Sequence, residues 1–221
     1  MRRLALLLAA LALAGCGGGD GDDASSASST EAATTTAQGG CRQVEAPEPK
    51  DGGGEKKPTS PLPAGTHELE VETNCGSFTI TLDPKSAPKT TASVAALADS
   101  GFYDDTTFHR IVPGFVIQGG DPTATGTGGP GYSTVDTPKP TTRYTEGVVA
   151  MAKTATEAPG TSGSQFFIVT GDDIGLPPEY AVIGTVTKGL PVVRKIGKLG
   201  DPATEEPTEV IVVEKMRHVT R

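Results

Sequence analysis

The sequence contains no tryptophan, and aromatic residues make up only 5% of its 221 residues. Its three cysteines and three histidines are too few and too scattered for a zinc cluster, so we expect no bound metal. Basic residues are outnumbered, with 19 Lys and Arg against 27 Asp and Glu. The net charge of −8 excludes nucleic acid as the default partner, because that binding needs a basic face that displaces counterions from phosphates. No apolar run reaches the roughly 18 residues that a membrane-spanning helix needs.

The first fifteen residues have the composition of a secretory signal. Arg2 and Arg3 supply positive charge, and an apolar stretch follows from Leu4 to Leu13. That stretch is too short for a transmembrane helix and has the length typical of secretion. The LAGC that ends at Cys16 resembles the lipobox of bacterial lipoproteins, which implies that Cys16 receives a diacylglycerol. We therefore predict a signal peptide at 1–15 and an extracytoplasmic protein anchored to the cell membrane by the lipid on Cys16.

Residues 16–65 have the composition of a linker. Gly, Ser, Ala and Thr predominate up to about residue 40, and proline is frequent after it. Val44 and Leu62 are the only bulky apolar side chains, so the segment has too little apolar surface to offset the entropy lost on ordering. We expect a disordered tether that holds a folded domain, residues 66–221, away from the membrane.

Two cysteines, Cys41 and Cys75, remain after lipidation. Outside the cytoplasm such a pair favours a disulfide, which would attach the end of the linker to the first strands of the domain. The alternative is two buried or free thiols. The sequence leaves this choice open because it does not give the separation of the two Cα atoms.

Alternation of apolar and polar residues predicts strands along the whole domain. Thr66–Thr73 and Phe78–Leu82 flank an Asn-Cys-Gly turn and predict a hairpin. Helices are expected at Ala87–Ser100 and Pro191–Lys198. The remaining predicted strands are Phe108–Val112, Phe115–Gln118, Gly147–Ala152, Gln165–Thr170, Tyr180–Val186 and Glu209–Lys215. The fold class is mainly β, and this set of short strands predicts a closed antiparallel barrel capped by two helices.

One glycine-rich segment imitates a nucleotide-binding motif. Gly126–Gly131 matches the pattern G-x-G-x-x-G, but that fingerprint requires a helix immediately after it. Ser133–Pro140 contains two prolines and no helical period. We therefore reject a dinucleotide site and expect no cofactor.

Three segments carry the most specific signal in the chain. They read FHRIVPGFVIQGGDP at Phe108–Pro122, GTGGPGY at Gly126–Tyr132 and GTSGSQFFIVT at Gly160–Thr170. In this order and at these separations, residues 66–221 resemble the cyclophilin family of peptidyl-prolyl cis–trans isomerases. The resemblance implies a closed eight-stranded antiparallel barrel capped by two helices, in agreement with the strand pattern. It also implies catalysis of rotation about X-Pro bonds, which needs no nucleophile, metal or proton shuttle.

The resemblance also implies a set of site residues. The catalytic set is Arg110, Phe115 and Gln118, and the substrate-binding set is Val116, Ala152, Lys153, Gln165, Phe167, Leu176 and Tyr180. Arg110 matches the catalytic arginine, whose permanent charge and forked donors suit the prolyl carbonyl and the developing nitrogen lone pair. Phe115 and Phe167 match aromatic walls of the proline pocket. Gln118 and Gln165 match polar residues that hold the substrate backbone and orient Arg110.

Several positions depart from the family's pattern. Gly175 and Tyr180 stand where many members have Trp and His, which contribute to the pocket rim and to recognition of cyclosporin-type macrocycles. Lys153 stands where Asn is usual and begins a loop that is a few residues longer. We therefore carry over no expectation of sensitivity to those compounds.

His109 is next to Arg110, and in a strand the two side chains point to opposite faces. A histidine beside a catalytic residue suggests a general base. Isomerisation transfers no proton, so a hydrogen-bonded core histidine is the favoured interpretation.

Two functions of different classes follow. The first is a membrane-tethered, monomeric isomerase that acts on proline-containing peptides and unfolded secreted proteins and assists their folding, where an X-Pro step can limit the rate. The second is a proline-peptide receptor in which isomerisation is incidental, because the same pocket serves both. A solute-binding lipoprotein is disfavoured, since the chain shows neither two α/β lobes nor the length they require.

Overall fold

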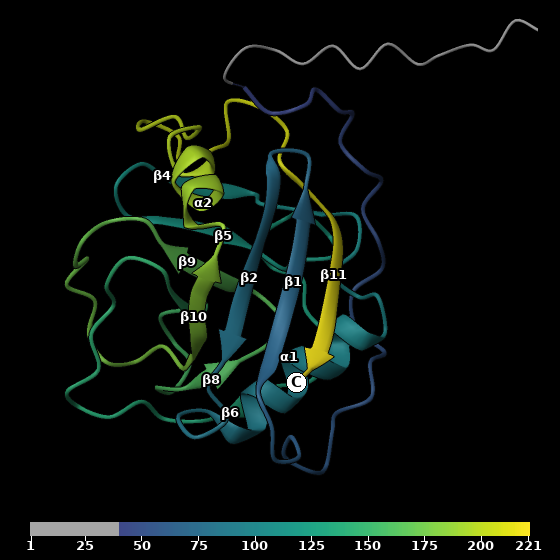
Figure 1. Ribbon diagram of the computed structural model, residues 1–221, viewed down its shortest axis with the longest axis vertical. Coiled ribbons are helices and arrows are strands. Elements are labelled where there is room, and N and C mark those ends of the chain that lie inside the picture. Colours follow the sequence, from purple (N-terminus) through teal and green to yellow (C-terminus); the bar gives the residue numbers. More distant parts are fainter. Residues whose placement is uncertain (1–39) are drawn as a thin grey trace, which may run out of the picture. The chain divides into compact units, whose positions relative to one another are not determined.

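The computed structural model describes residues 40–221 (Figure 1). The predicted signal peptide at 1–15, Cys16 and the first part of the predicted linker lie outside the described residues. In the part that is described, no helix combines the length and apolarity needed to cross a membrane.

Nine strands form one antiparallel sheet in the order β3-β11-β1-β2-β10-β7-β9-β5-β4, and β6 pairs with β8 in a separate two-stranded sheet. The strands are β1 (His67–Thr73), β2 (Gly76–Leu82), β3 (Thr106–Thr107), β4 (Arg110–Val112), β5 (Val116–Gly119), β6 (Thr134–Val135), β7 (Val148–Met151), β8 (Thr161–Ser162), β9 (Phe166–Val169), β10 (Val182–Lys188) and β11 (Val212–Thr220). The helices are α1 (Pro88–Asp99) and α2 (Leu190–Ile196). Every predicted strand and helix has a counterpart here, whereas β3, β6 and β8, two residues each, are too short to show a period.

The sheet is curled but open, so the predicted closed eight-stranded barrel is not confirmed. Its two edges, β3 and β4, come from one stretch of chain, Thr106–Val112. The beginning of this stretch pairs with β11 and its end pairs with β5. The edges therefore follow one another along the backbone and do not pair with each other.

The two helices cover opposite ends of the sheet in Figure 1, α1 near the C-terminus and α2 near β4. Pro88 lies in the first turn of α1 and Pro191 in the first turn of α2. Backbone amides of the first turn have no acceptor within the helix, so a proline there costs no hydrogen bond. The helices contribute buried side chains such as Val94, Leu97 and Ile196 to the main core. The predicted capping helices are thus present.

Both faces of the sheet are apolar at the neighbouring strands β5 and β9. On β9, Phe166 and Ile168 point into the main core, while Phe167 and Val169 belong to a second apolar cluster. Because side chains alternate along a strand, this second cluster lies on the other face of the sheet. Phe167, which the resemblance places in a wall of the proline pocket, lies in this second cluster.

Residues 40–65, which we call the N-terminal strap, run along one side of the domain without forming a helix or strand (Figure 1). Cys41 is buried in the main core, and Leu62 packs against that core from the strap's far end. The amide of Arg42 donates to the carbonyl of Asn74 at 2.8 Å. This half of the predicted linker has a defined path, because a disulfide and backbone hydrogen bonds supply contacts that its few apolar side chains do not.

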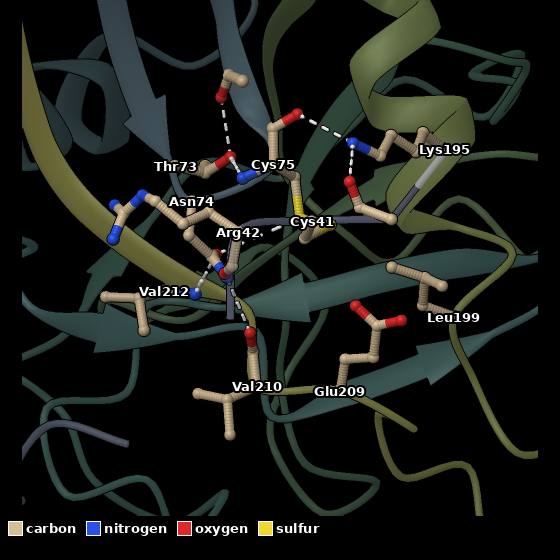
Figure 2. Close-up of a disulfide and its surroundings, with 12 residues drawn as sticks. Cys41, Arg42, Thr73, Asn74, Cys75, Lys195, Leu199, Glu209, Val210 and Val212 are labelled. Carbon is tan, nitrogen blue, oxygen red and sulfur yellow. Dashed lines mark hydrogen bonds between the residues drawn. A yellow bond between two sulfur atoms is a disulfide. The ribbon is translucent and has the colours of Figure 1, made fainter. Parts of the chain in front are cut away.

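Cys41 and Cys75 form a disulfide across a sequence separation of 34 (Figure 2). Around it, Lys195 Nζ donates to the carbonyl of Gly40 at 2.9 Å. The side chain of Asn74 donates to the carbonyls of Arg42 and Val210 and accepts from the amide of Val212, the first residue of β11. In the chain-entropy account, a loop of this length stabilises the fold by about 3–4 kcal/mol. The strap is therefore covalently attached to the β1–β2 turn.

His109 lies between β3 and β4 with both ring nitrogens buried and without a hydrogen-bond partner. The expectation of a hydrogen-bonded core histidine holds only in part, because the ring nitrogens are buried but the residue as a whole is half-buried and the expected hydrogen bond is missing. Burial lowers the pKa of His109, and the Arg110 guanidinium adds to this shift, while the Asp121 carboxylate and the Thr107 backbone oppose it. The imidazole is consequently neutral in the folded protein around neutral pH.

We predict that His109 makes stability fall as the pH is lowered through about 6.5, the ordinary histidine pKa. In that range the unfolded chain binds a proton that the folded chain does not, so unfolding becomes more favourable. The slope from this one group is at most about 1.4 kcal/mol per pH unit. Urea unfolding of wild type and His109→Gln between pH 5.5 and 8 measures it. The variant should show the shallower dependence, and equal slopes would contradict the assignment.

Candidate active site

The register of three strands brings the central site residues into one row. Arg110 on β4 pairs with Gln118 on β5, and Gln118 pairs in turn with Phe167 on β9. Phe167 then pairs with Ala150 on β7. Directly opposed residues of antiparallel strands point to the same face, so a guanidinium, an amide and an aromatic ring lie side by side on the outer face of the sheet.

Hydrogen bonds hold the polar end of this row. Arg110 Nη1 donates to Gln118 Oε1 at 3.3 Å, and Gln118 Nε2 donates to Gln165 Oε1 at 3.1 Å. Gln165 Nε2 donates to the carbonyl of Gly128 at 3.0 Å. From the other side, Glu205 Oε2 accepts from Arg110 Nε at 2.7 Å. The guanidinium is therefore held at two points while part of it still faces the pocket.

A pocket of about 310 Å³ lies beside Arg110. Six of its nine lining residues are apolar or aromatic, and the full set is Arg110, Phe115, Val116, Gln118, Ala152, Lys153, Phe167, Leu176 and Tyr180. A second hollow of about 250 Å³ shares three of these residues and adds Gln165 and the Gly126–Gly128 segment. The two together form a groove that has aromatic walls beside Arg110 at one end and the Gly126–Gly128 segment at the other.

A buried tyrosine supports the aromatic wall of the groove. The hydroxyl of Tyr144 donates to the carbonyl of Tyr180 at 2.8 Å and accepts from the amide of Tyr180 at 3.0 Å. The two rings meet edge to face with centroids 6.0 Å apart. Burial raises the pKa of Tyr144, which keeps its hydroxyl protonated as a donor. Tyr144 thereby fixes the backbone that carries one wall of the pocket.

Lys153 lies folded against the same wall. Only 3% of its side chain is exposed, and its Nζ contacts Glu179 Oε2 at 2.9 Å and stands 5.5 Å from the centre of the Tyr180 ring. At the rim, a Cβ on Gly175 would meet no atom within 4 Å. The rim is therefore open at Gly175, the position where the resemblance implies a Trp in many members.

The loop after β5 is organised by Asp121, which is fully buried. Its carboxylate accepts from Thr123 N at 2.8 Å and from Gly128 N at 3.1 Å. Burial by itself would raise the pKa of Asp121, but these donors outweigh it and the pKa is lowered. A Cβ on Gly128 would lie 2.1 Å from Asp121 Oδ1, so only glycine fits there. This arrangement aims the Gly128 carbonyl at Gln165.

The structure brings all ten residues of the predicted catalytic and substrate-binding sets to this groove. Nine line the larger pocket, and Gln165 lines the adjoining hollow. Cys41 and Cys75 line neither, and Cys16 lies outside the described residues.

Sequence reasoning did not single out Glu205, Tyr144 or Asp121. Glu205 is 95 residues from Arg110 and has no motif around it, so no sequence signal was available for it. Tyr144 is an isolated aromatic. Asp121 lies within the quoted FHRIVPGFVIQGGDP segment and could have been noticed there.

The groove can hold a small apolar ring against aromatic walls and present fixed donors to the amide beside it. Within residues 40–221, no cluster of three or more His, Cys, Asp or Glu is placed to hold a metal ion. Arg110 and Gln118 offer hydrogen bonds to a carbonyl oxygen or to an amide nitrogen that becomes pyramidal. These groups stabilise a twisted amide by position and charge, without proton transfer.

Comparison with known proteins agrees with this geometry. The family model described as "Cyclophilin type peptidyl-prolyl cis-trans isomerase/CLD" matches residues 68–218. Peptidyl-prolyl cis-trans isomerase-like 1 of Neurospora crassa is 40% identical over 156 residues, which are 69% of this chain and 94% of the relative. Peptidyl-prolyl cis-trans isomerase A of Mycobacterium tuberculosis is 38% identical over 172 residues, covering 70% and 93%.

Solved structures give the same result for the fold. A cyclophilin type peptidyl-prolyl cis-trans isomerase of Cryptosporidium parvum superposes with a TM-score of 0.64 at 30% identity, over 71% of this chain and 99% of that one. A structure determined in the presence of the dipeptide Ala-Pro also has a TM-score of 0.64, at 31% identity, over 70% and 99%. The matched span and these identities show that the chain belongs to the cyclophilin-type peptidyl-prolyl cis-trans isomerase family.

Proposed function

We propose that this isomerase acts outside the cytoplasm, on X-Pro bonds of newly secreted proteins, from a lipid anchor on Cys16. The observation that carries the isomerase assignment is the groove itself, in which Arg110 and Gln118 stand beside a pocket walled by Phe115, Phe167 and Leu176. The extracytoplasmic location depends on the signal-like residues 1–15 and the LAGC sequence.

The reaction is well matched to these groups. Amide resonance opposes rotation by about 18–20 kcal/mol, and uncatalysed X-Pro isomerisation takes tens to hundreds of seconds. As the bond twists, the nitrogen loses conjugation and gains a lone pair that can accept a hydrogen bond. A donor such as Arg110 that binds this state better than either planar isomer lowers the barrier, and each tenfold acceleration requires about 1.4 kcal/mol of such preference.

Proline-containing peptides are the proposed substrates. The Cryptosporidium parvum relative has been solved in the presence of Ala-Pro, a dipeptide with the bond in question. In this chain, the pocket of about 310 Å³ has room for one prolyl ring. Unfolded secreted proteins expose such bonds, and their isomerisation can limit folding.

Replacing Arg110 tests the activity. We expect Arg110→Ala to lower kcat/KM on an X-Pro peptide by about 100-fold or more, the usual cost of removing one electrostatic donor from a transition state. A protease-coupled or NMR exchange assay measures the rate. Arg217→Ala is the matched control, because Arg217 is an exposed arginine of β11 that pairs with Glu72. Full activity in Arg110→Ala, or no acceleration by wild type, would refute the mechanism.

Glu205 is proposed as a positioning residue for Arg110. It has a left-handed backbone (φ 61°), its carbonyl accepts from the amide of Ile111 at 2.9 Å, and its carboxylate holds Arg110. We expect Glu205→Ala to reduce kcat/KM by about threefold to tenfold, a modest loss because the ion pair is partly exposed.

The same peptide assay checks this prediction, with the exposed neighbour variant Glu206→Ala as control. In an Arg110→Ala background, Glu205→Ala should cause no further loss, since residues that act through one another are not additive. Additive losses would show that Glu205 acts by another route.

The lipid anchor is tested directly on Cys16. We expect intact-mass spectrometry of the membrane fraction to show acyl mass on this residue, and Cys16→Ser to move the protein to the soluble fraction. An unmodified, soluble wild-type product from native expression would contradict the anchor and leave the isomerase assignment intact.

A further inference from the structure

The N-terminal strap lies before the part of the chain that matches the isomerase family, which is residues 68–218. Relatives at 40% and 38% identity cover only 69% and 70% of this chain. The family's known site therefore gives no role to residues 40–65. The structure places them in repeated contact with one wall of the groove.

The strap donates a series of hydrogen bonds to a single loop, residues 122–133. The amide of Lys50 donates to the carbonyl of Pro122 at 2.9 Å, and the amide of Gly53 donates to the carbonyl of Gly129 at 2.7 Å. Further along, the amide of Glu55 donates to Pro130 O at 3.1 Å and Lys57 Nζ donates to Ser133 O at 2.7 Å. The order of donors follows the order of acceptors, so strap and loop run alongside each other.

The packing between strap and loop is close. A Cβ on Gly131 would lie 2.9 Å from the Cα of Gly53 and 2.9 Å from the amide nitrogen of Gly54. Contacts at this distance admit no side chain. The loop thus packs directly against the backbone of the strap.

The middle of the same loop contacts the hydrogen-bond network of Arg110. Gly128, next to the Gly129 that the strap holds, accepts from Gln165 Nε2 at 3.0 Å. Gln165 accepts from Gln118, which accepts from Arg110. Hydrogen bonds and the backbone of one residue, Gly129, therefore connect Gly53 of the strap to the guanidinium.

We propose that the strap is a positioning element of the active site: by holding Gly129 and Pro130, it fixes the Gly128 carbonyl that orients Gln165, Gln118 and Arg110. The proposal rests on the isomerase function of that site.

Two anchors keep the strap in place. The Cys41–Cys75 disulfide attaches its start to the β1–β2 turn, and Lys50 Nζ donates to the carbonyls of Phe102 and Asp104. A segment without helix or strand loses much entropy when it is ordered, and the covalent link lowers that cost. Weakening the second anchor should release the strap from the loop without touching any group that lines the groove.

The test compares lysine variants of the full chain. Lys50→Met removes the anchor and Lys57→Met removes the bond to Ser133. Lys56→Met is the matched control, because Lys56 is exposed, carries the same charge and shows no hydrogen bond among the described residues. We expect Lys50→Met and Lys57→Met to lower kcat/KM on an X-Pro peptide by about twofold to tenfold, and Lys56→Met to leave it unchanged.

Two further measurements separate positioning from a general loss of structure. Thermal unfolding shows whether each variant is folded at the assay temperature. In a Gln165→Ala background, Lys50→Met and Lys57→Met should cause no additional loss, because the strap acts through Gln165. Activity equal to that of Lys56→Met, or an undiminished loss in the Gln165→Ala background, would overturn the proposal.

An NMR readout makes the outcome independent of catalysis. The side-chain amide signal of Gln165 should shift in Lys57→Met and stay in place in Lys56→Met. If wild type gives no acceleration, the proposed function fails. The Gln165 signal still shows whether the strap positions this side chain. An unchanged Gln165 signal in Lys57→Met would overturn the positioning role even with an active enzyme.

Discussion

The antiparallel register between β4, β5 and β9 is the constraint on which the site depends. It sets Arg110 opposite Gln118 and Gln118 opposite Phe167, so that charge, amide and aromatic ring share one face. A shift by one residue would turn every one of these side chains to the opposite face. Ile117 and Ile168, which fill the core from the other face, make that shift costly because they would be exposed. The core therefore maintains the site.

Hydrogen bonds around this row hold the Arg110 side chain, which is flexible by itself, in one position. Glu205 and Gln118 hold two different nitrogens of Arg110, and Tyr144 holds the backbone beneath Tyr180. A donor that is already in place when the amide twists needs no reorganisation at that moment. The polar partners come from segments far apart in the chain, which ties the guanidinium's position to the integrity of the whole fold.

The strap extends this arrangement beyond the region shared with the family. Its composition, rich in Gly, Pro and charged residues, is that of a linker, and it forms no regular secondary structure. The strap is ordered by its contacts with the rest of the domain, which are the disulfide at Cys41 and hydrogen bonds to carbonyl groups of the 122–133 loop. A segment of low hydrophobicity can thus be an integral part of a domain when the domain supplies its contacts.

The strands and helices were predictable because each is encoded by a local pattern, and so were Arg110, Phe115, Gln118 and Phe167, which lie in contiguous motifs. These elements, the family resemblance and the ten groove residues could all be inferred from local patterns in the chain. Those patterns did not determine the open edges of the sheet, the pairing of Cys41 with Cys75, the course of the strap or the part played by Glu205. Those features are contacts between residues far apart in sequence, such as the 95 positions that separate Arg110 from Glu205. They become visible in the folded protein, because such a contact forms only when the intervening chain brings its two partners together.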